Sequence, residues 1–465
     1  MGIRARERHA MADIHKIVEQ ARQYFDSGET RDVDHRTESL LRIKRYLERH
    51  EGEIEQALKS DLNKCRFEAQ MCEITLVYQE IDYMVRHIKK WAKPKKARAT
   101  LSQFPGKARV YPEPYGVVLI MSPWNYPFQL TVMPLIGALA AGNCAVLKPS
   151  KDAPATSRFF KEMADVCFGS GEVQVVEGGR FENEQLLNEA YDYIFFTGSP
   201  HVGRVVMEKA AKHLTPVTLE LGGKSPVIVD HTADLKATAR RILFGKLLNA
   251  GQTCVAPDYV LAERSIKDEL AQLLIEESKA MLPDETYMHA HFGRIVNQKH
   301  FDRLQGLLEG QTLLTGGQVW PEQRQIAFTL VDEPKMDSPL MRDEIFGPIL
   351  PILAFDKQEE AVERVRALPR PLALYLFTKD EETEEYFLDT LSFGGGCVND
   401  TVLHLASHLI PFGGVGASGM GCYHGKYSFD TFSHLKSVLI KRGSMDFSLR
   451  YHPYRRPDGK LPGIF

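Results

Sequence analysis

Val117-Val118-Leu119-Ile120 and Cys144-Ala145-Val146-Leu147 are two short apolar runs, separated by a stretch long enough for a helix. Two more runs follow at similar spacing, Val173-Gln174-Val175-Val176 and Tyr193-Ile194-Phe195-Phe196. Continuous apolar runs of this length are typical of strands that are buried on both faces. Because helix-length segments alternate with them, the stretch predicts an α/β fold with a doubly wound parallel sheet.

Small and polar residues follow each of these runs. They are Ser122-Pro123, Lys148-Pro149-Ser150, Glu177-Gly178-Gly179 and Thr197-Gly198-Ser199. Ligands of open α/β sheets bind at the carboxyl ends of the strands, so we expect a ligand site here. The run from Thr197 to Gly203, which includes Ser199 and Val202, is not a strict Gly-x-Gly-x-x-Gly. A helix that begins there could still hold a pyrophosphate on its free N–H groups.

The rest of the chain divides around this sheet. Residues 11–93 have helical periodicity, and residues 98–116, with several prolines, resemble a protruding hairpin. A second set of strand-like runs begins near residue 225, continues to residue 399 and predicts a second α/β domain. The Gly-rich stretch 411–416 closes that domain, and Ser437-Val438-Leu439-Ile440 is expected to be an edge or interface strand. No internal repeat is present in the sequence.

The composition narrows the class of protein. The chain has 465 residues, of which 43% are hydrophobic and 26% charged, which indicates a globular protein of two or three domains. A net charge of −3 gives no reason to expect nucleic acid or an anionic membrane as a partner. No apolar run approaches the ~18–20 residues of a membrane span, and no secretion signal is present. Met1 and Met11 both remain candidates for the natural start.

The cysteines point to a location and to one reactive residue. None of the seven forms a Cys-x-x-Cys pair, so neither a zinc site nor a disulfide framework is indicated, and we expect a cytoplasmic protein. Cys254, in Gly251-Gln252-Thr253-Cys254-Val255, lies between a helical pattern and a strand-like run. Such a position can hold a thiol rigidly and still expose it to a ligand, whereas structural cysteines usually lie inside an apolar stripe.

The helix before Cys254 is expected to begin after an N-cap at Thr232 and to stop at Gly251. Cys254 would then lie beyond the negative end of the helix, where the macrodipole disfavours a thiolate. A positively charged group is then needed to favour the Cys254 thiolate. An oxidised nicotinamide would serve this purpose, so cofactor binding would help to activate the nucleophile.

Two polar residues could assist such a thiol. Glu220, after Val217-Thr218-Leu219, is either an exposed carboxylate at a strand end or a partly buried general base that activates water. Asn125, between Trp124 and Tyr126, is either an ordinary turn residue or a rigid amide donor for an oxyanion.

The remaining candidates are weaker by themselves. Lys148 could be a solvated loop lysine, and Glu344, with Phe346 beside it, either enters a strand or holds ribose hydroxyls. Trp124, Tyr126 and Phe128 could line an apolar substrate tunnel or simply fill a core. His404, His408 and His424 lack the spacing of a metal site and are expected to have core or surface roles, so no metal is predicted.

Three motifs together carry a resemblance to a known family. They are Gly-Gln-Thr-Cys-Val-Ala-Pro-Asp-Tyr at 251–259, Leu-Glu-Leu-Gly-Gly-Lys-Ser-Pro at 219–226 and Pro-Phe-Gly-Gly-Val-Gly-x-Ser-Gly-Met-Gly at 411–421. From about residue 15 to about residue 440 the chain resembles the aldehyde dehydrogenase superfamily, and its class 3 branch in particular. The resemblance implies a Rossmann-type cofactor domain (residues 1–97 and 117–221) and an α/β catalytic domain (222–410). It also implies a bridging or oligomerisation element (98–116 and 411–445), which leaves 446–465 as a C-terminal tail.

The resemblance also implies roles for individual residues. Cys254 would be the nucleophile and Glu220 the base for deacylation, while Asn125 and the Cys254 backbone N–H would form the oxyanion hole. The cofactor, NAD or NADP, would contact residues at the strand ends and beyond them: Lys148, Lys151, Gly198, Ser199, Val202, Gly203, Glu344 and Phe346. Class 3 members are typically homodimers that favour medium-chain aliphatic and aromatic aldehydes.

One residue departs from the family pattern. Many relatives have glutamate directly after Lys-Pro-Ser, where it can hold ribose hydroxyls and repel a 2′-phosphate; this chain has Lys151. We therefore expect NADP to be accepted at least as well as NAD.

Three alternatives to a hydrolytic aldehyde dehydrogenase remain open on the sequence. An acylating dehydrogenase would not need Glu220 as a hydrolytic base. A cysteine hydrolase would need a histidine beside Cys254. A non-catalytic binding protein could keep the fold, although the presence of Cys254, Glu220 and Asn125 argues against it.

Overall fold

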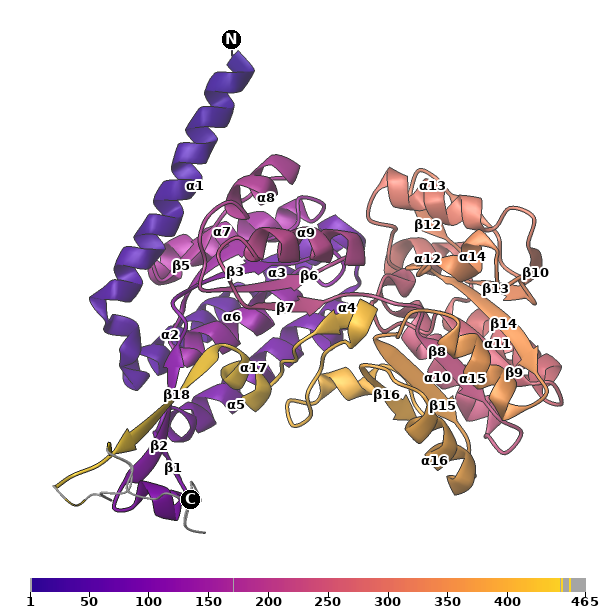
Figure 1. The fold of residues 1–465 in the computed structure, drawn as a ribbon. Helices are drawn as coiled ribbons and strands as arrows, with labels where there is room; N and C mark the ends of the chain where they lie inside the picture. Colours follow the sequence, from indigo (N-terminus) through magenta and orange to yellow (C-terminus); the bar gives the residue numbers. More distant parts are fainter. Residues whose placement is uncertain (1, 170, 444, 446–450, 453–465) are drawn as a thin grey trace.

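The computed structural model of the chain describes residues 2–169, 171–443, 445 and 451–452 (Figure 1). Two large sheets form two α/β bodies that lie side by side, and a small sheet extends from the first body (Figure 1). The predicted tail at 446–465 lies outside the described residues, apart from 451 and 452. None of the described helices is long and apolar enough to cross a membrane.

The first body contains the predicted parallel sheet. Its strand order is β17 (Gly419–Met420), β7 (Val217–Glu220), β6 (Tyr193–Thr197), β3 (Val117–Met121), β4 (Cys144–Lys148) and β5 (Val173–Val175). Every pair is parallel except β17 with β7. The helices between these strands are α6 (Gln129–Ala141), α7 (Pro154–Phe168), α8 (Arg180–Leu186) and α9 (Pro200–Ala210). The alternation read from the sequence is confirmed.

Helices from the N-terminal part of the chain complete the first body. They are α1 (Gly2–Ser27), α2 (Val33–Arg49), α3 (Glu51–Leu62), α4 (Arg66–Ala69) and α5 (Thr75–Trp91), with short turns η1 (Glu29–Arg31) and η2 (Gln70–Ile74). The periodic residues Leu40, Ile43 and Leu47 are fully buried, which is why the helical pattern was readable.

The second body contains seven strands. Their order is β10 (Thr312–Thr315), β13 (Thr329–Asp332), β14 (Ile349–Phe355), β9 (Tyr259–Glu263), β8 (Pro226–Val229), β15 (Ala373–Phe377) and β16 (Gly395–Val398), and only the β10–β13 pair is antiparallel. A separate two-stranded ribbon joins β11 (Val319–Trp320) to β12 (Gln325–Ile326). The sequence did not predict β10 to β13.

Helices cover this second sheet. They are α10 (Leu235–Leu247), α11 (Lys267–Met281), α12 (Glu285–His291), α13 (Gln298–Leu307), α14 (Pro339–Arg342), α15 (Gln358–Arg366) and α16 (Glu381–Thr390). The N-cap predicted for α10 is wrong. Asp234, not Thr232, caps the helix, since its carboxylate accepts a 3.1 Å hydrogen bond from the Ala237 backbone N–H. The Thr232 hydroxyl instead accepts from the Lys379 N–H at 2.7 Å.

The α-helix also ends four residues earlier than Gly251. After Leu247 the chain enters a short turn, η4 (Leu248–Gly251), in which Asn249 and Ala250 have φ values of 50° and 52°. Non-glycine residues rarely adopt this left-handed conformation, so the turn before Cys254 is strained.

The small sheet is formed by β1 (Lys95–Ala97), β2 (Lys107–Pro114) and β18 (Ser433–Ile440), in that order. The predicted hairpin is present, although it begins at residue 95, and the predicted edge strand begins at residue 433. The segment predicted as one bridging unit, 411–445, divides in the structure. Its part β17 pairs with β7, and only β18 joins the hairpin.

Candidate active site

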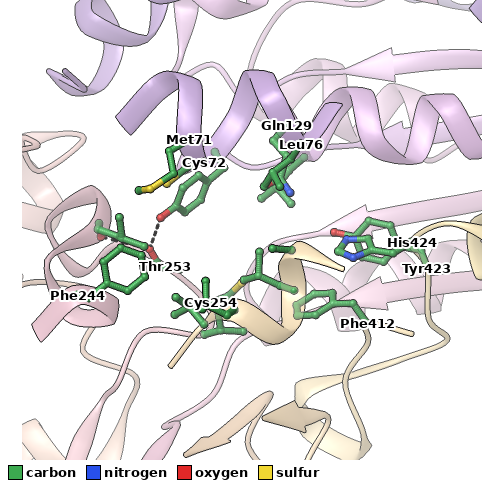
Figure 2. A pocket seen from close by; sticks show the side chains of 18 residues that line it. Met71, Cys72, Leu76, Gln129, Phe244, Thr253, Cys254, Phe412, Tyr423 and His424 are labelled. Carbon is green, nitrogen blue, oxygen red and sulfur yellow. Dashed lines mark hydrogen bonds between the residues drawn. The ribbon is translucent and has the colours of Figure 1, made fainter. Parts of the chain in front are cut away.

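Cys254 borders a cavity of about 790 Å³, part of which is open to solvent (Figure 2). The wall opposite Cys254 comes from η2 and α5, and the side wall comes from residues near 412–424 (Figure 2). Most of the lining is apolar: Met71, Leu76, Leu130, Phe244, Leu248, Val255, Val402 and Phe412 all contribute to it. An apolar cavity with a few polar groups is typical of a small-molecule site.

Burial is the main influence on the Cys254 thiol. It raises the pKa of the thiol well above its usual value, and the carboxylates of Glu344 and Glu220 raise it further. The backbone N–H groups of Cys254 and Val255 partly oppose this effect. The direction agrees with a disfavoured thiolate, but the cause is burial and negative charge rather than the dipole of α10, which ends at Leu247.

Glu220 is a buried carboxyl group. It is the last residue of β7, it is 2% exposed, and neither carboxyl oxygen has a hydrogen-bond partner among the described residues. Its backbone is fixed, because its carbonyl accepts a 2.9 Å hydrogen bond from the Gly198 N–H. Burial raises the pKa of Glu220 well above its usual value near 4.5. A carboxyl group kept in such a place is costly, which is a feature of functional sites.

Asn125 lies beside the Cys254 loop. The residue is 3% exposed, and its side-chain amide donates a 3.1 Å hydrogen bond to the backbone carbonyl of Gln252. An amide NH₂ has two hydrogens, so one donor is used for this anchor and the second is left for a ligand. The structure therefore brings Asn125 and the loop of Cys254 together, with the amide held in one orientation.

The lysines after β4 differ in burial. Lys148 is 3% exposed and its ammonium donates to the carbonyls of Pro149 (2.6 Å) and Gly178 (2.7 Å). Burial lowers the pKa of Lys148 to about 8. Lys151 is exposed, and a Cβ at Gly179 would lie 3.1 Å from its Cδ. Both lysines therefore border the same Gly178-Gly179 turn.

The predicted helix N-terminus is present at α9. Ser199 is its N-cap and accepts from the Val202 N–H at 3.4 Å, and Pro200 occupies the first turn. Gly203 allows close packing, since a Cβ there would lie 2.8 Å from the Leu221 side chain. Gly198 similarly leaves no room for a side chain beside the Phe196 ring.

Glu344 meets the same region from the second body. A side chain at Gly222 would collide with its carboxylate, and the Gly223 backbone N–H donates to it. Burial raises the pKa of Glu344 to about 8, and its Oε1 has no partner among the described residues. A buried, unpaired acceptor next to Gly222 fits the ribose hydroxyls of a dinucleotide, and the α9 N-terminus fits its pyrophosphate.

A buried ion pair fixes the segment that carries Glu344. Lys224 contacts Asp258 at 2.5 Å and also donates to the carbonyls of Leu340 and Asp343, at 2.9 and 3.0 Å. The Asp258 carboxylate accepts from the Ile345 N–H at 2.9 Å. Both charged residues lie in the motifs quoted from the sequence, but no signal there distinguished them from neighbouring polar residues.

Only one of the three predicted tunnel aromatics lines the cavity. Tyr126 does, and its hydroxyl hydrogen-bonds the Thr253 hydroxyl at 2.7 Å. Phe128 is fully buried and stacks on Phe160, with ring centres 5.9 Å apart, because it faces the core behind α6. Trp124 packs edge-on against Phe346, with ring centres 5.4 Å apart. Neither Phe128 nor Trp124 is among the residues that line this cavity.

The sequence also missed much of the cavity wall. Met71, Cys72 and Tyr423 had no distinguishing pattern, and they reach the cavity only through the tertiary fold. His424 lines the cavity too, stacks on Phe412 at 5.3 Å and is 2% exposed, and burial lowers its pKa to about 3. Among the described residues, no group of three or more His, Cys, Asp or Glu side chains could hold a metal ion.

Comparisons with known proteins point to one family. The model of the aldehyde dehydrogenase family matches residues 4–438. The chain is 44% identical to the 4,4'-diaponeurosporen-aldehyde dehydrogenase of Staphylococcus aureus, over 94% of this chain and 97% of that protein. It is 45% identical to aldehyde dehydrogenase family 3 member H1 of Arabidopsis thaliana (97% and 94%), and 40% identical to a dimeric, NADP-preferring aldehyde dehydrogenase of Canis lupus familiaris (95% and 98%).

A solved structure gives the same result for the fold. The substrate-bound state of Staphylococcus aureus AldH superimposes with a TM-score of 0.93 at 44% identity, and the match covers 95% of this chain and 97% of that one. With the family model matched over most of its length and relatives above 40% identity, this chain belongs to the aldehyde dehydrogenase family.

Proposed function

We propose that this aldehyde dehydrogenase oxidises aldehydes to carboxylic acids through a covalent thioester on Cys254. One observation supports the proposal most strongly: the Cys254 thiol borders an apolar cavity, and the buried, unpaired carboxyl group of Glu220 is near enough to raise the pKa of the thiol. A nucleophile, a base and a cavity for an apolar substrate are then present in one place.

In the first half of the reaction the Cys254 sulfur bonds to the aldehyde carbon, and the thiol proton passes to solvent, to which the cavity is partly open. The resulting oxyanion accepts hydrogen bonds from the Asn125 amide and the Cys254 backbone N–H. Loss of hydride from the carbon then gives the thioester. NAD or NADP supplies the hydride acceptor when it is bound.

In the second half, Glu220 removes a proton from water. The hydroxide attacks the thioester carbon, the carbon–sulfur bond breaks, and the proton held by Glu220 passes to the sulfur, so that the acid and the Cys254 thiol are released. Dividing the oxidation into two steps lowers the barrier of each. Burial raises the pKa of Glu220, which makes its carboxylate a stronger base than an exposed one.

We propose that Glu344 holds the cofactor ribose, and that Lys148, Gly198, Ser199, Val202, Gly203 and Phe346 form the rest of the cofactor site. Lys151 is exposed beside the Gly178-Gly179 turn and could pair with a 2′-phosphate. The name of the dog relative, an NADP-preferring enzyme, adds support. We therefore propose that NADP is used at least as well as NAD.

The substrate proposal follows from the lining of the cavity. Its walls are mostly apolar, with Tyr126, Phe244 and Phe412 as aromatic members. We propose medium-chain aliphatic or aromatic aldehydes as substrates, since such chains lose water contact on entering.

Two further proposals concern the oligomeric state and the location of the protein. A homodimer is supported by the exposed apolar side chains of β18, Leu435 (58%) and Leu439 (44%), and by the dog relative, which is named as dimeric. A cytoplasmic location is supported by the cysteines, which are all free.

The alternatives have less support. A cysteine hydrolase needs a histidine on the thiol, but the described hydrogen bonds include none between Cys254 and a histidine. Burial also disfavours the protonated imidazole that His424 would become on accepting the thiol proton. An acylating dehydrogenase would not need the buried Glu220 carboxyl group.

The test is aldehyde-dependent formation of NAD(P)H, with substrates from acetaldehyde to dodecanal and benzaldehyde and with each cofactor. The proposal expects turnover and free acid as the product. Turnover that requires coenzyme A or phosphate would indicate the acylating reaction, and aldehyde-independent ester hydrolysis without turnover would indicate a hydrolase.

A further inference from the structure

Two charged side chains are completely buried behind the active site. Lys64, between α3 and α4, pairs with Glu73 of η2, and the exposure of both side chains is 0%. Removing two ions from water costs several kcal/mol for each, and their attraction offsets this only if further hydrogen bonds satisfy the remaining atoms. The partners of the pair therefore indicate what it holds in place.

The remaining bonds of the pair all go to one segment, residues 125–129. The Lys64 ammonium donates to the backbone carbonyl of Asn125 at 2.8 Å and lies 3.9 Å from the centre of the Tyr126 ring. The second oxygen of Glu73 accepts from the backbone N–H groups of Phe128 (2.9 Å) and Gln129 (3.1 Å). The segment that carries Asn125 is thus held at four points by one ion pair.

A second buried acid holds the loop of Cys254 in the same way. Glu68 of α4 accepts a 2.7 Å hydrogen bond from the backbone N–H of Asn249, in the strained turn before Cys254. The Asn249 side chain then donates to the Asn125 carbonyl at 2.7 Å and to the Gln252 carbonyl at 3.1 Å. Asn249 therefore links the two segments directly.

The local helix geometry explains how the segment around η2 can both line the cavity and hold residues 125–129 in place. The chain passes from α4 through the π-helical turn η2 into α5, and π-turns are frequent at functional sites. Within this turn Met71 and Cys72 line the cavity, while Glu73 is directed into the buried network.

We infer that Lys64, Glu73 and Glu68 form a buried clamp that positions Asn125 against the Cys254 loop, and that they are positioning residues of this enzyme. The inference rests on the proposed roles of Asn125 and Cys254. The clamp touches neither of the reacting atoms; it acts through the backbone of residues 125–129 and through Asn249.

The variants must separate positioning from simple stability. Lys64→Met leaves Glu73 buried without its partner and should lower the melting temperature. The double variant Lys64→Met/Glu73→Gln removes both charges, and its Gln side chain can still accept from the Phe128 and Gln129 N–H groups. We expect its melting temperature to return close to that of the wild type. The control is Arg66→Met, which breaks an exposed pair with Glu55 (3.0 Å) two residues along the chain.

The measurement is the single-turnover rate of NAD(P)H formation, with the cofactor dissociation constant measured in parallel. Although stable, the double variant should form NAD(P)H more slowly than the wild type, on the order of 10²-fold, since small misplacements of catalytic groups have effects of that size. Cofactor binding and the Arg66→Met control should match the wild type. Adding Asn125→Ala to the double variant should cause no further loss beyond that of Asn125→Ala alone, because the clamp acts through Asn125.

A double variant whose rate recovers together with its melting temperature would overturn the inference, since the pair would then be structural only. So would an additional, independent loss in the triple variant. Failure of the proposed function would give a different result: Asn125→Ala alone would then form NAD(P)H as fast as the wild type.

Discussion

The side-chain amide of Asn125 donates a 3.1 Å hydrogen bond to the backbone carbonyl of Gln252, two residues before Cys254. The two residues lie 127 positions apart in the sequence and belong to different bodies of the fold. This bond fixes the orientation of the Asn125 amide relative to the Cys254 loop before any substrate is bound. Preorganised donors of this kind stabilise an oxyanion without the cost of reorganisation during the reaction.

Replacement of Asn125 by alanine should therefore slow the first half of the reaction. Loss of one oxyanion donor typically costs about 10²–10³ in rate. Single-turnover formation of NAD(P)H measures this step, and the cofactor dissociation constant should stay within about twofold of wild type as the control. A variant as fast as wild type would remove Asn125 from the oxyanion site.

Replacement of Glu220 by glutamine should block the second half. The shape of the side chain is kept, so acylation continues, but water is no longer deprotonated. We expect one rapid equivalent of NAD(P)H per site, followed by a steady state slower by about 10²–10⁴-fold. Stopped-flow absorbance resolves the two phases. If the burst is absent while turnover stays slow, Glu220 acts before the thioester and not after it.

The same variant should change the pH dependence of stability. The pKa of Glu220 is raised in the folded protein by burial, so between about 4.5 and that raised value the folded state binds more protons than the unfolded state. Stability from this group is therefore lost as pH rises through that window. Glu220→Gln should melt higher than wild type at pH 8, with the difference vanishing near pH 4. Equal melting temperatures at pH 8 would show that folding does not raise the pKa of Glu220.

Replacement of Lys151 by glutamate tests the cofactor proposal. Lys151 is exposed, so its attraction to a 2′-phosphate is screened and modest. We expect kcat/KM for NADP to fall roughly 5–10-fold while that for NAD stays the same or rises. Lys161→Glu, a change of the same charge on the exposed face of α7, is the matched control. A wild-type enzyme with a strong preference for NAD would already contradict the proposal.

Local sequence patterns predicted most of the strands and helices of the two bodies. The strands at 117–121, 144–148 and 193–197 were readable because both of their faces are buried, which leaves a continuous apolar run. The strand β10 was missed because it is mostly exposed and carries no such run. Thr232 and Asp234 are both good N-cap residues, and only the tertiary contact between Thr232 and Lys379 decides between them.

The candidate residues that the sequence could single out lie at a strand end or in a motif, as Glu220 and Cys254 do. Residues whose contribution depends on long-range contacts could not be singled out. Phe128 and Tyr126 are equivalent as sequence, yet one faces the core and the other the cavity. Lys64 and Glu73 resemble ordinary charged residues of an N-terminal helical region, and only the fold shows that both are buried.

The central claim is that Cys254 carries the acyl group, and the most direct measurement is mass spectrometry of the Glu220→Gln variant after mixing with an aldehyde and NAD(P). The account predicts one acyl group per chain, attached to the peptide that contains Cys254, and formed only when both aldehyde and cofactor are present. The Cys254→Ala variant should carry no adduct and form no NAD(P)H. An acyl group on another cysteine, or aldehyde oxidation that persists in Cys254→Ala, would contradict the account.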